Sequence, residues 1–338
     1  MAAVHRGDGG RLQVPCSLRR HFHTLDTDTE GHPITSLNGL LGMAVPDNEL
    51  AAGGDVWLNT MQRWGTQAIR TDCRMEHVMT APGFFDWAQT DRLVEGCRSR
   101  GMRVLLVLGC GMLMDNPAAR AQFRTFAEAA AIRYKGKVAW WEILNEANMT
   151  YLRPASYALL LRAVYPAIKA VQPKATIIYG GNASIPSEKA ANLQGAVEYL
   201  ERVYAAGGRN FFNAVAHHPY QYPYTYAQDV HWGGMRIMNR IREVMNANGD
   251  QNKLLWITEV GAPTGGSDRA VTEATQALML RQIVAMARAP GSGLGPVFWY
   301  SFQDRKTNRD SHGAYFGCRH QFGREKLVAA DFRRLAPG

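Results

Sequence analysis

The chain has 338 residues, of which 46% are hydrophobic and 20% are charged, and its formal charge at pH 7 is +9. This composition excludes wholesale disorder and provides enough apolar side chains for a large core. The basic residues are scattered, and no helix-turn-helix, zinc-finger or RRM signature accompanies them, so we expect no nucleic-acid partner. The positive charge leaves attraction to an acidic polysaccharide or an anionic envelope open.

Five cysteines are widely spaced, at Cys16, Cys73, Cys97, Cys110 and Cys318, which argues against a disulfide scaffold or a zinc framework. The N-terminus, MAAVHRGDGGRLQVPCSLRR, lacks the apolar stretch of a signal peptide, and no segment approaches the apolar length of a membrane span. We therefore expect no membrane insertion. The default location is cytoplasmic, and a secreted or particle-associated protein stays open if an export signal was removed.

Residues 1–35 are rich in Gly, Asp, Thr and His and lack periodicity, so we expect an extended or partly disordered arm there. One barrel domain is expected over 36–338, because short apolar runs alternate with longer amphipathic segments in the pattern of βα units. Eight strands are predicted, at 39–46, 67–73, 103–109, 138–146, 175–181, 213–220, 253–261 and 296–302.

Helices are predicted between these runs, among them 86–100, 118–134 and 272–288, and a last helix at 327–335 can close the ring. Successive strands start roughly 30 to 45 residues apart, which is enough for right-handed βαβ crossovers. The first strand is not followed by GxGxxG, and no Walker A sequence occurs. These features favour a (β/α)8 TIM barrel, an α/β fold, over a doubly wound nucleotide-binding sheet.

Two glutamates stand at predicted strand ends. Glu146 follows Asn145 at the end of the fourth strand, and Glu259 lies near the end of the seventh. The C-terminal ends of the strands form the active-site face of such barrels, so these two ends face each other across the mouth. Paired carboxyl groups suit hydrolysis of a glycosidic bond, with one group protonated and one ionised. A separation of about 5 Å predicts retention of configuration, and about 9 Å predicts inversion.

The segments around these glutamates resemble those of clan A glycoside hydrolases. WWEILNEAN resembles the clan's fourth-strand W-E-x-x-N-E-x-N motif, WITEVG its nucleophile strand, AVAHHPY its His-x-Tyr element and IRTDC its Arg-bearing strand. The stretch from IRTDC into the third strand is similar to glycoside hydrolase family 39, with family 5 as the near alternative. Where relatives often place an aromatic residue after the second-strand Asp, this chain has Cys73-Arg74-Met75.

The resemblance implies a retaining enzyme in which Glu146 is the acid/base and Glu259 the nucleophile. It further implies that Asn145 hydrogen-bonds the sugar 2-hydroxyl, and that this hydrogen bond becomes stronger in the oxocarbenium-like transition state. Tyr220 would donate a hydrogen bond to Glu259, and the charge of Arg70 would favour its ionised form.

Neighbouring polar residues receive separate interpretations. We interpret His218 as a polar contact in the site and His217 as structural. Glu142 precedes Glu146 by four residues, so it projects to the same side about two layers deeper in the strand, where it would orient Arg70 or another barrel cation. A metal site needs three or four convergent ligands, and the sequence spacing offers too few, so neither a metal nor an organic cofactor is expected.

Aromatic residues near strand ends are candidates for stacking on sugars. Trp299 is the preferred platform by resemblance to the Trp of the clan's last strand, with Tyr300 or Phe302 in that role if the register shifts by one. The loop after the sixth strand carries four more aromatic residues, which predict either a cleft wall or a lid packed on the barrel: Tyr222, Tyr224, Tyr226 and Trp232.

The expected partner is therefore an oligosaccharide or polysaccharide substrate. Two alternatives remain: a carbohydrate-binding barrel without turnover, and a transglycosylase that uses the same two glutamates with another acceptor. The loops CGMLMDNP and GNASIPSEKA, after the third and fifth strands, would decide between an open cleft and a closed pocket.

Overall fold

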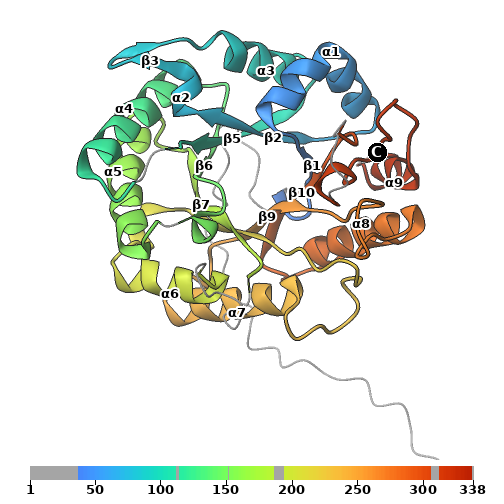
Figure 1. The fold of residues 1–338 in the computed structure, drawn as a ribbon. Helices are drawn as coiled ribbons and strands as arrows, with labels where there is room; N and C mark the ends of the chain where they lie inside the picture. Colours follow the sequence, from blue (N-terminus) through green and yellow to red (C-terminus); the bar gives the residue numbers. More distant parts are fainter. Residues whose placement is uncertain (1–36, 112–113, 151, 186–193, 306–311, 337–338) are drawn as a thin grey trace, which may run out of the picture.

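The computed structural model describes residues 37–111, 114–150, 152–185, 194–305 and 312–336. The expected N-terminal arm, 1–35, lies outside the described residues. Within them, a closed ring of parallel strands is surrounded by helices (Figure 1). The predicted (β/α)8 barrel is confirmed.

All eight predicted strands are present in the barrel, where each pairs in parallel with its neighbours and the last pairs with the first. They are β1 (Leu41–Ala44), β2 (Ala68–Arg74), β5 (Arg103–Gly109), β6 (Trp140–Ile143), β7 (Thr176–Ala183), β8 (Ala214–His218), β9 (Leu255–Val260) and β10 (Leu294–Tyr300). The largest difference from the prediction is in β6, which ends before Leu144 because the backbone there turns into a left-handed conformation.

Helices cover the outside of the barrel, and in the described ranges the longer ones are α1 (Asp47–Arg63), α3 (Ala88–Arg98), α4 (Pro117–Arg133), α5 (Pro154–Val171), α6 (Ala196–Ala205), α7 (Gly234–Ala247), α8 (Glu273–Arg288) and α9 (Leu327–Leu335). The four predicted helices correspond to α3, α4, α8 and α9. The start of α4 has the residues that commonly begin a helix. Asn116 accepts a hydrogen bond from the Ala118 N–H, and Pro117 occupies the first helical position. In the described part of the chain, no helix has the length and apolarity to cross a membrane.

A short helix and a hairpin between β2 and α3 were not predicted. They are α2 (Met75–Val78), β3 (Met79–Ala81) and β4 (Phe84–Phe85), and they project at the edge of the barrel (Figure 1). Gly83 turns the hairpin with a φ of +79°, a conformation that glycine adopts readily. The insertion enlarges the rim beside the C-terminal end of β2.

The barrel has an inner and an outer apolar layer. Trp140 and Trp256 meet at right angles with ring centroids 5.1 Å apart, although their strands, β6 and β9, are not neighbours in the ring. Their rings therefore lie inside the barrel, in the same cluster as Phe298. Alternation of side chains along each strand places the adjacent Trp141 and Trp299 in the outer layer, against the helices.

Substitution of an inner tryptophan tests this packing. Trp256→Ala is expected to lower the free energy of unfolding by about 3–5 kcal/mol, because it leaves a cavity in the barrel interior. Urea unfolding followed by circular dichroism measures the loss. The control is Phe84→Ala in the hairpin, whose side chain is 68% exposed and whose removal should change stability by less than about 0.5 kcal/mol. Equal effects of the two substitutions would contradict the assignment.

Candidate functional site

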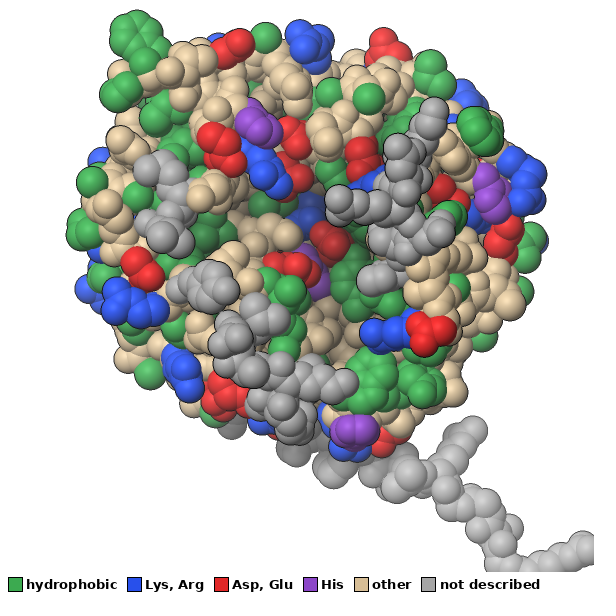
Figure 2. Space-filling view, viewed as in Figure 1, with side chains coloured by type: hydrophobic (Ala, Val, Ile, Leu, Met, Phe, Trp, Pro, Cys, Tyr) green, Lys and Arg blue, Asp and Glu red, His purple; other side chains and the backbone are tan. Residues whose placement is uncertain are grey.

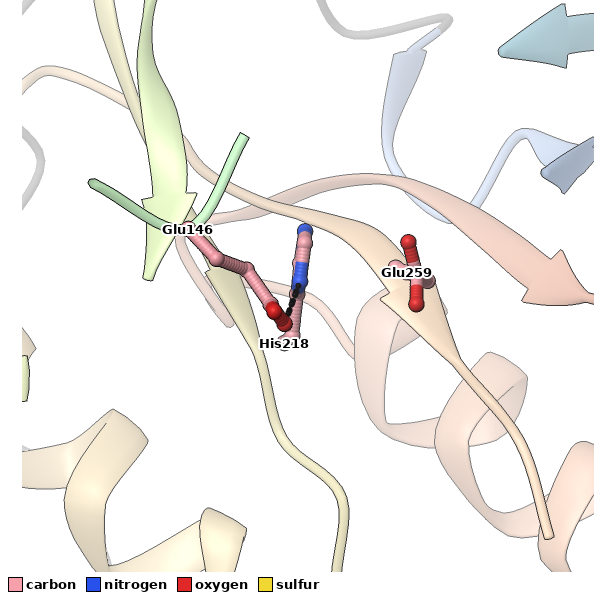
Figure 3. Close-up of side chains that lie close together, drawn as sticks. All are labelled: Glu146, His218 and Glu259. Atoms are coloured by element: carbon pink, nitrogen blue, oxygen red, sulfur yellow. Dashed lines mark hydrogen bonds and ion pairs between the residues drawn. The ribbon is translucent and has the colours of Figure 1, made fainter. Parts of the chain in front are cut away.

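The C-terminal ends of the strands surround a hollow at the centre of the molecule, with acidic, basic and histidine side chains on its floor (Figure 2). Glu146 and Glu259 meet there, with His218 beside them (Figure 3). One atom from each of these three side chains belongs to a group in which all distances are within 4.8 Å. The two carboxylates are therefore separated by the short distance, roughly 5 Å, at which a carboxylate can attack rather than activate a water.

The loop after β6 positions Glu146. Leu144 and Glu146 have φ values of 62° and 46°, a left-handed conformation that is uncommon for residues other than glycine. The Glu146 N–H donates to the Gly181 carbonyl at 2.9 Å, and the Glu146 carbonyl accepts from the Met149 N–H at 2.8 Å. The first bond ties the loop to β7 and the second lies within the loop, so the surrounding structure maintains a conformation that would otherwise be unfavourable.

A bulge in β9 positions Glu259. Between Ile257 and Val260, β9 gains one residue relative to β10. Consecutive residues of a regular strand point to opposite faces, but a bulge can turn two of them to the same side. Accordingly Thr258 hydrogen-bonds groups inside the barrel, and Glu259 reaches Arg70 and Tyr220 at its mouth.

Arg70, on β2, connects three acceptors. Its guanidinium donates to Glu142 at 2.8 and 3.1 Å, to Glu259 at 3.0 Å and to Asn145 at 2.5 Å. Burial alone would raise the pKa of Glu142, but the charge and hydrogen bonds of Arg70 outweigh it and hold that pKa below its usual range. The structure thus gives Glu142 the interpretation made from its sequence position, a partner that orients Arg70.

Tyr220 contacts the second oxygen of Glu259. The phenol O–H donates to Oε1 at 2.7 Å, while Arg70 binds Oε2. Burial and the neighbouring Glu259 raise the pKa of Tyr220 well above its ordinary value, so the phenol remains a donor. Both oxygens of Glu259 are consequently held by hydrogen-bond donors, which fix the orientation of the carboxylate.

A chain of hydrogen bonds leads from Glu142 to Glu146. The Thr258 hydroxyl donates to Glu142 at 3.2 Å, and its oxygen lies 3.1 Å from His218 Nε2. Because a hydroxyl has one proton, Thr258 must accept the proton of His218 Nε2–H. His218 Nδ1 is 2.8 Å from Glu146 Oε1, and this contact requires one proton shared between the two atoms.

His217 faces the opposite side of β8, in agreement with the structural role predicted for it. Its Nε2 lies 3.0 Å from Ser184 Oγ, whose hydroxyl donates to the His218 carbonyl at 2.7 Å, so His217 Nε2 carries the hydrogen. Burial, followed by the charge of His218, lowers the pKa of His217 to about 3. The ring is therefore neutral in the folded protein at ordinary pH.

The prediction for Trp299 is wrong. Its side chain is 0% exposed and belongs to the outer apolar layer, so it does not reach the hollow. The next residue, Tyr300, faces the hollow beside Glu259 and accepts a hydrogen bond from Arg305. The register of alternation was off by one, which is the alternative considered for Tyr300; Phe302 is fully buried.

The aromatic residues in the loop after β8 differ in burial. Tyr226 is buried in the outer layer, whereas Tyr224 is 41% exposed and meets the Trp232 ring at 5.8 Å. The Arg269 guanidinium lies over the Tyr222 ring at 4.9 Å from its centroid.

The loops CGMLMDNP and GNASIPSEKA, which were expected to decide between an open cleft and a closed pocket, are described only in part. Residues 112–113 and 186–193 lie outside the described residues.

Two residues of the site were missed by sequence reasoning. Thr258 connects His218 to Glu142, but a threonine in a strand carries no distinctive signal. Gly181 donates its N–H to Glu142, and a Cβ there would lie 2.1 Å from His218 Nε2, so only glycine allows this approach. The glycine pair Gly180-Gly181 in the fifth barrel strand was the available signal, because glycine in a strand often marks a bulge or a close approach.

Glu146, His218 and Glu259 also form the group of side chains, within the described ranges, that could bind a metal ion. The sequence could not indicate it, because the three residues come from three different strands or strand ends. Both ring nitrogens of His218 already take part in hydrogen bonds, to Glu146 and to Thr258. To bind His218, a metal ion would have to replace at least one of these two hydrogen bonds.

A parallel (β/α)8 barrel with glutamates at the ends of its fourth and seventh strands has the architecture of clan A glycoside hydrolases. The family model described as cellulase (glycosyl hydrolase family 5) matches residues 28–301. The chain therefore belongs to glycosyl hydrolase family 5. The resemblance to the clan is confirmed, and the matching family is the one expected as the near alternative to family 39.

Several solved structures are similar in fold. A family 39 glycoside hydrolase from the gut symbiont Bacteroides cellulosilyticus WH2 has a TM-score of 0.71 and 22% identity, covering 89% of this chain and 64% of that chain. A monomeric β-xylosidase from Caulobacter crescentus CB15 has a TM-score of 0.66 and 15% identity, covering 88% and 67%. An exo-β-1,4-mannosidase from Opitutaceae bacterium strain TAV5 has a TM-score of 0.66 and 16% identity, covering 94% and 62%.

At these identities the likeness shows the fold alone. The chain spans about two thirds of the length of these structures. Comparison with curated proteins gives no significant match.

The neutral His217 generates a prediction for the pH dependence of stability. The unfolded chain binds a proton at His217 below about pH 6.5, whereas the folded protein does so only near pH 3, so stability should fall as the pH is lowered through this window. His217→Gln should make the decline between pH 6.5 and 4.5 shallower by up to about 1.4 kcal/mol per pH unit. Urea unfolding at several pH values measures the slope.

The matched control for this experiment is His231→Gln, which removes a histidine from an exposed position. It should keep the wild-type slope. A His217→Gln variant with the same pH dependence as wild type would show that the folded protein protonates His217 as readily as the unfolded chain does.

Proposed function

We propose that this chain is a retaining O-glycoside hydrolase that cleaves an oligosaccharide or polysaccharide by double displacement. Glu259 is the nucleophile and Glu146 is the acid/base. The observation that carries the proposal is the short separation of the two carboxylates, which belong to a group with all distances within 4.8 Å. At this separation one carboxylate reaches the anomeric carbon while the other reaches the leaving oxygen.

In the first step, an oxygen of Glu259 attacks the anomeric carbon, and the bond from that carbon to the leaving oxygen breaks. Glu146 donates its proton to the leaving oxygen, so the leaving group departs as an alcohol. Arg70 and Tyr220 each bind one oxygen of Glu259, which orients the nucleophile. The product of this step is a glycosyl ester on Glu259.

In the second step, Glu146 acts as a base. It removes a proton from a water molecule whose oxygen attacks the anomeric carbon, and the ester bond to Glu259 breaks. Two inversions give net retention. His218 is hydrogen-bonded to Glu146 in both steps and supports either protonation state, because Nδ1 can accept or donate.

Asn145 and Tyr300 are suited to bind the sugar. Arg70 is only a donor, so the Asn145 carbonyl must face it and the Asn145 NH₂ group is left for the sugar 2-hydroxyl. Tyr300 takes the stacking role that was assigned to Trp299, since its ring borders the hollow.

The substrate class follows from family 5 and from the names of similar structures. These include a β-xylosidase, an exo-β-1,4-mannosidase, a glucosidase and a β-galactosidase. Aryl β-glycosides of xylose, mannose, glucose and galactose therefore form the first screen, with polysaccharides of the same sugars as the second.

Substitution of each glutamate tests the roles. Glu146→Ala and Glu259→Ala are each expected to lower kcat by at least about 100-fold on activated aryl glycosides. Added azide should restore turnover with opposite anomeric configurations: retained in Glu146→Ala, where azide replaces water, and inverted in Glu259→Ala, where it replaces the nucleophile. Proton NMR of the products measures the configuration.

The control is Glu201→Ala on the exposed face of α6, which should leave kcat unchanged. Wild-type rates in Glu259→Ala would exclude this residue as the nucleophile. Binding of oligosaccharides without any turnover would favour a carbohydrate-binding barrel. Turnover that yields longer glycosides in the presence of a sugar acceptor would favour a transglycosylase.

Thr258 generates a second prediction, for the hydrogen-bond chain to the acid/base. Thr258→Val removes the link between Glu142 and His218 with little change in shape. It should slow glycosides with poor leaving groups about tenfold or more, and 2,4-dinitrophenyl glycosides much less, because only a poor leaving group needs the proton of Glu146. Thr258→Ser should retain the wild-type pattern. An equal loss on all leaving groups would indicate a merely structural role.

A further inference from the structure

The end of the barrel opposite the mouth carries the excess positive charge of the chain. Every helix runs back from the mouth, so the connections from each helix to the next strand lie together at this end, which we call the base. Counted from the last turn of each helix, seven such connections contain twelve Lys and Arg residues and two acidic ones, Glu95 and Asp250. Their excess of ten positive charges is larger than the +9 of the whole chain. The connections are 60–67, 95–102, 130–139, 168–175, 202–213, 244–254 and 285–293.

Four consecutive connections hold nine of the twelve cations and one acidic residue, Glu95. They precede β5, β6, β7 and β8, which are successive neighbours in the ring, and α4, α5 and α6 lie side by side on the same flank (Figure 1). The first two connections touch, because the Arg98 guanidinium donates to the Lys137 carbonyl at 3.0 Å. The cations therefore share one surface, which we call the basal patch: 95–102, 130–139, 168–175 and 202–213.

Ion pairs offset only part of the charge of the basal patch. Four of its cations pair with a carboxylate: Arg100 with Asp55, Arg133 with Asp91, Lys137 with Glu95 and Arg209 with Asp250. Asp250 is shared, because Lys253 also binds it at 2.9 Å. Lys135 and Lys174 are exposed and have no ion pair among the described residues. These two lysines are therefore available to an anionic partner.

The helix ends offset another part of the charge. The C-terminus of a helix carries a partial negative charge and carbonyl groups without intrahelical partners, and both attract cations. Lys169 accordingly donates to the carbonyls of Pro173 and Ala175. The partial charge amounts to about half a unit for each helix. Each connection of the patch carries two or three cations, so stabilisation of the helix ends does not account for all of them.

The basal patch offers both cations and hydrogen-bond acceptors to a partner. The cations bind carboxylate or sulfate groups, and the last carbonyls of the helices, each with two lone pairs, accept hydrogen bonds from hydroxyl groups. An acidic polysaccharide has both kinds of group along one chain. A nucleic-acid backbone is a denser row of anionic acceptors, and phosphates prefer the N-terminal ends of helices, whereas the patch lies at C-terminal ends.

An anionic lipid surface fits the basal patch less well. Proteins that lie on a membrane surface insert apolar or aromatic side chains below the headgroups. Ile132 is the one large apolar side chain that the described ranges of the patch expose. Binding would thus depend on charge and hydrogen bonds, which a polysaccharide satisfies along its whole length.

We propose that the basal patch binds an anionic polysaccharide, whose carboxylate or sulfate groups contact Lys135, Lys174 and the neighbouring cations. The patch and the mouth lie at opposite ends of the strands, so a polymer bound at the base leaves the catalytic hollow open. The barrel is then held on an acidic polymer while its mouth faces away from it. This inference goes beyond the proposed hydrolysis and does not require it.

Charge reversal tests the patch. The double variant Lys135→Glu/Lys174→Glu should bind immobilised polygalacturonate or dextran sulfate at least about tenfold more weakly than wild type, because the attraction of exposed charges acts over a short range. Biolayer interferometry with the full chain at low ionic strength measures the affinity. Lys135→Arg/Lys174→Arg, which keeps both charges, should bind like wild type. Thermal unfolding should be unchanged in both variants, since the two side chains are exposed.

The matched control is Arg92→Glu/Arg240→Glu, which changes the net charge by the same amount at exposed positions of α3 and α7 outside the patch. It should bind like wild type. An equal loss of affinity in the two charge-reversed variants would show that binding follows overall charge and would overturn the patch. Equal binding of wild type to neutral dextran would overturn it as well.

Two further measurements test the partner and the location. Vesicles containing phosphatidylserine and duplex DNA should bind more weakly than the acidic polysaccharides; tighter binding of either one overturns the assigned partner. Polygalacturonate should not inhibit hydrolysis of a neutral aryl glycoside, and competitive inhibition would place the polymer at the mouth instead of the base. If no glycoside is turned over, the hydrolase proposal fails, and the binding assay still decides whether the basal patch exists.

Discussion

The geometry of the site depends on one buried cation, the Arg70 guanidinium. A guanidinium presents five N–H donors in a rigid plane, so it can fix several acceptors at once. Burying it costs several kcal/mol unless carboxylates compensate, and Glu142 and Glu259 both do. The aim of Glu259 and the orientation of Asn145 follow directly from this arrangement. Glu142 is kept ionised by the same cation and accepts the hydrogen bond of the Thr258 hydroxyl. This bond orients the hydroxyl, which in turn orients the ring of His218.

The fold could be predicted from the sequence because each strand of the barrel is covered on both faces. Such strands appear as continuous apolar runs, and their number and spacing are specific to a closed parallel barrel. The same property conceals which way each side chain points. In β6, with the sequence WWEI, every residue is buried, so the sequence alone does not show that Trp140 points into the barrel and Trp141 points toward the helices. The error at Trp299 has this origin, because its strand is apolar throughout.

The meeting of Glu146 and Glu259 at the barrel mouth could be predicted because motifs place both glutamates at strand ends, but the way each side chain is oriented could not. Glu259 is turned by a bulge in β9, and Glu146 by a left-handed loop. A bulge is a property of the pairing between two strands, so it leaves little trace in either one. The contacts of His218 likewise require strands far apart in sequence to meet. The glycine pair at Gly180-Gly181 was the visible sign that another chain segment approaches closely.

The overall charge of the chain says little about the ligand of the cleft. The formal charge of +9 allows an acidic partner, yet three cations that the structure describes at the barrel mouth are compensated locally: Arg70 by two carboxylates, Arg305 by Glu49 and Arg74 in part by Glu76. Charges on the outer helices act weakly there, because exposed charges are screened over about 8 Å at physiological ionic strength. Recognition of a ligand in the cleft therefore depends on directed hydrogen bonds and ring contacts, which cannot be inferred from the net charge.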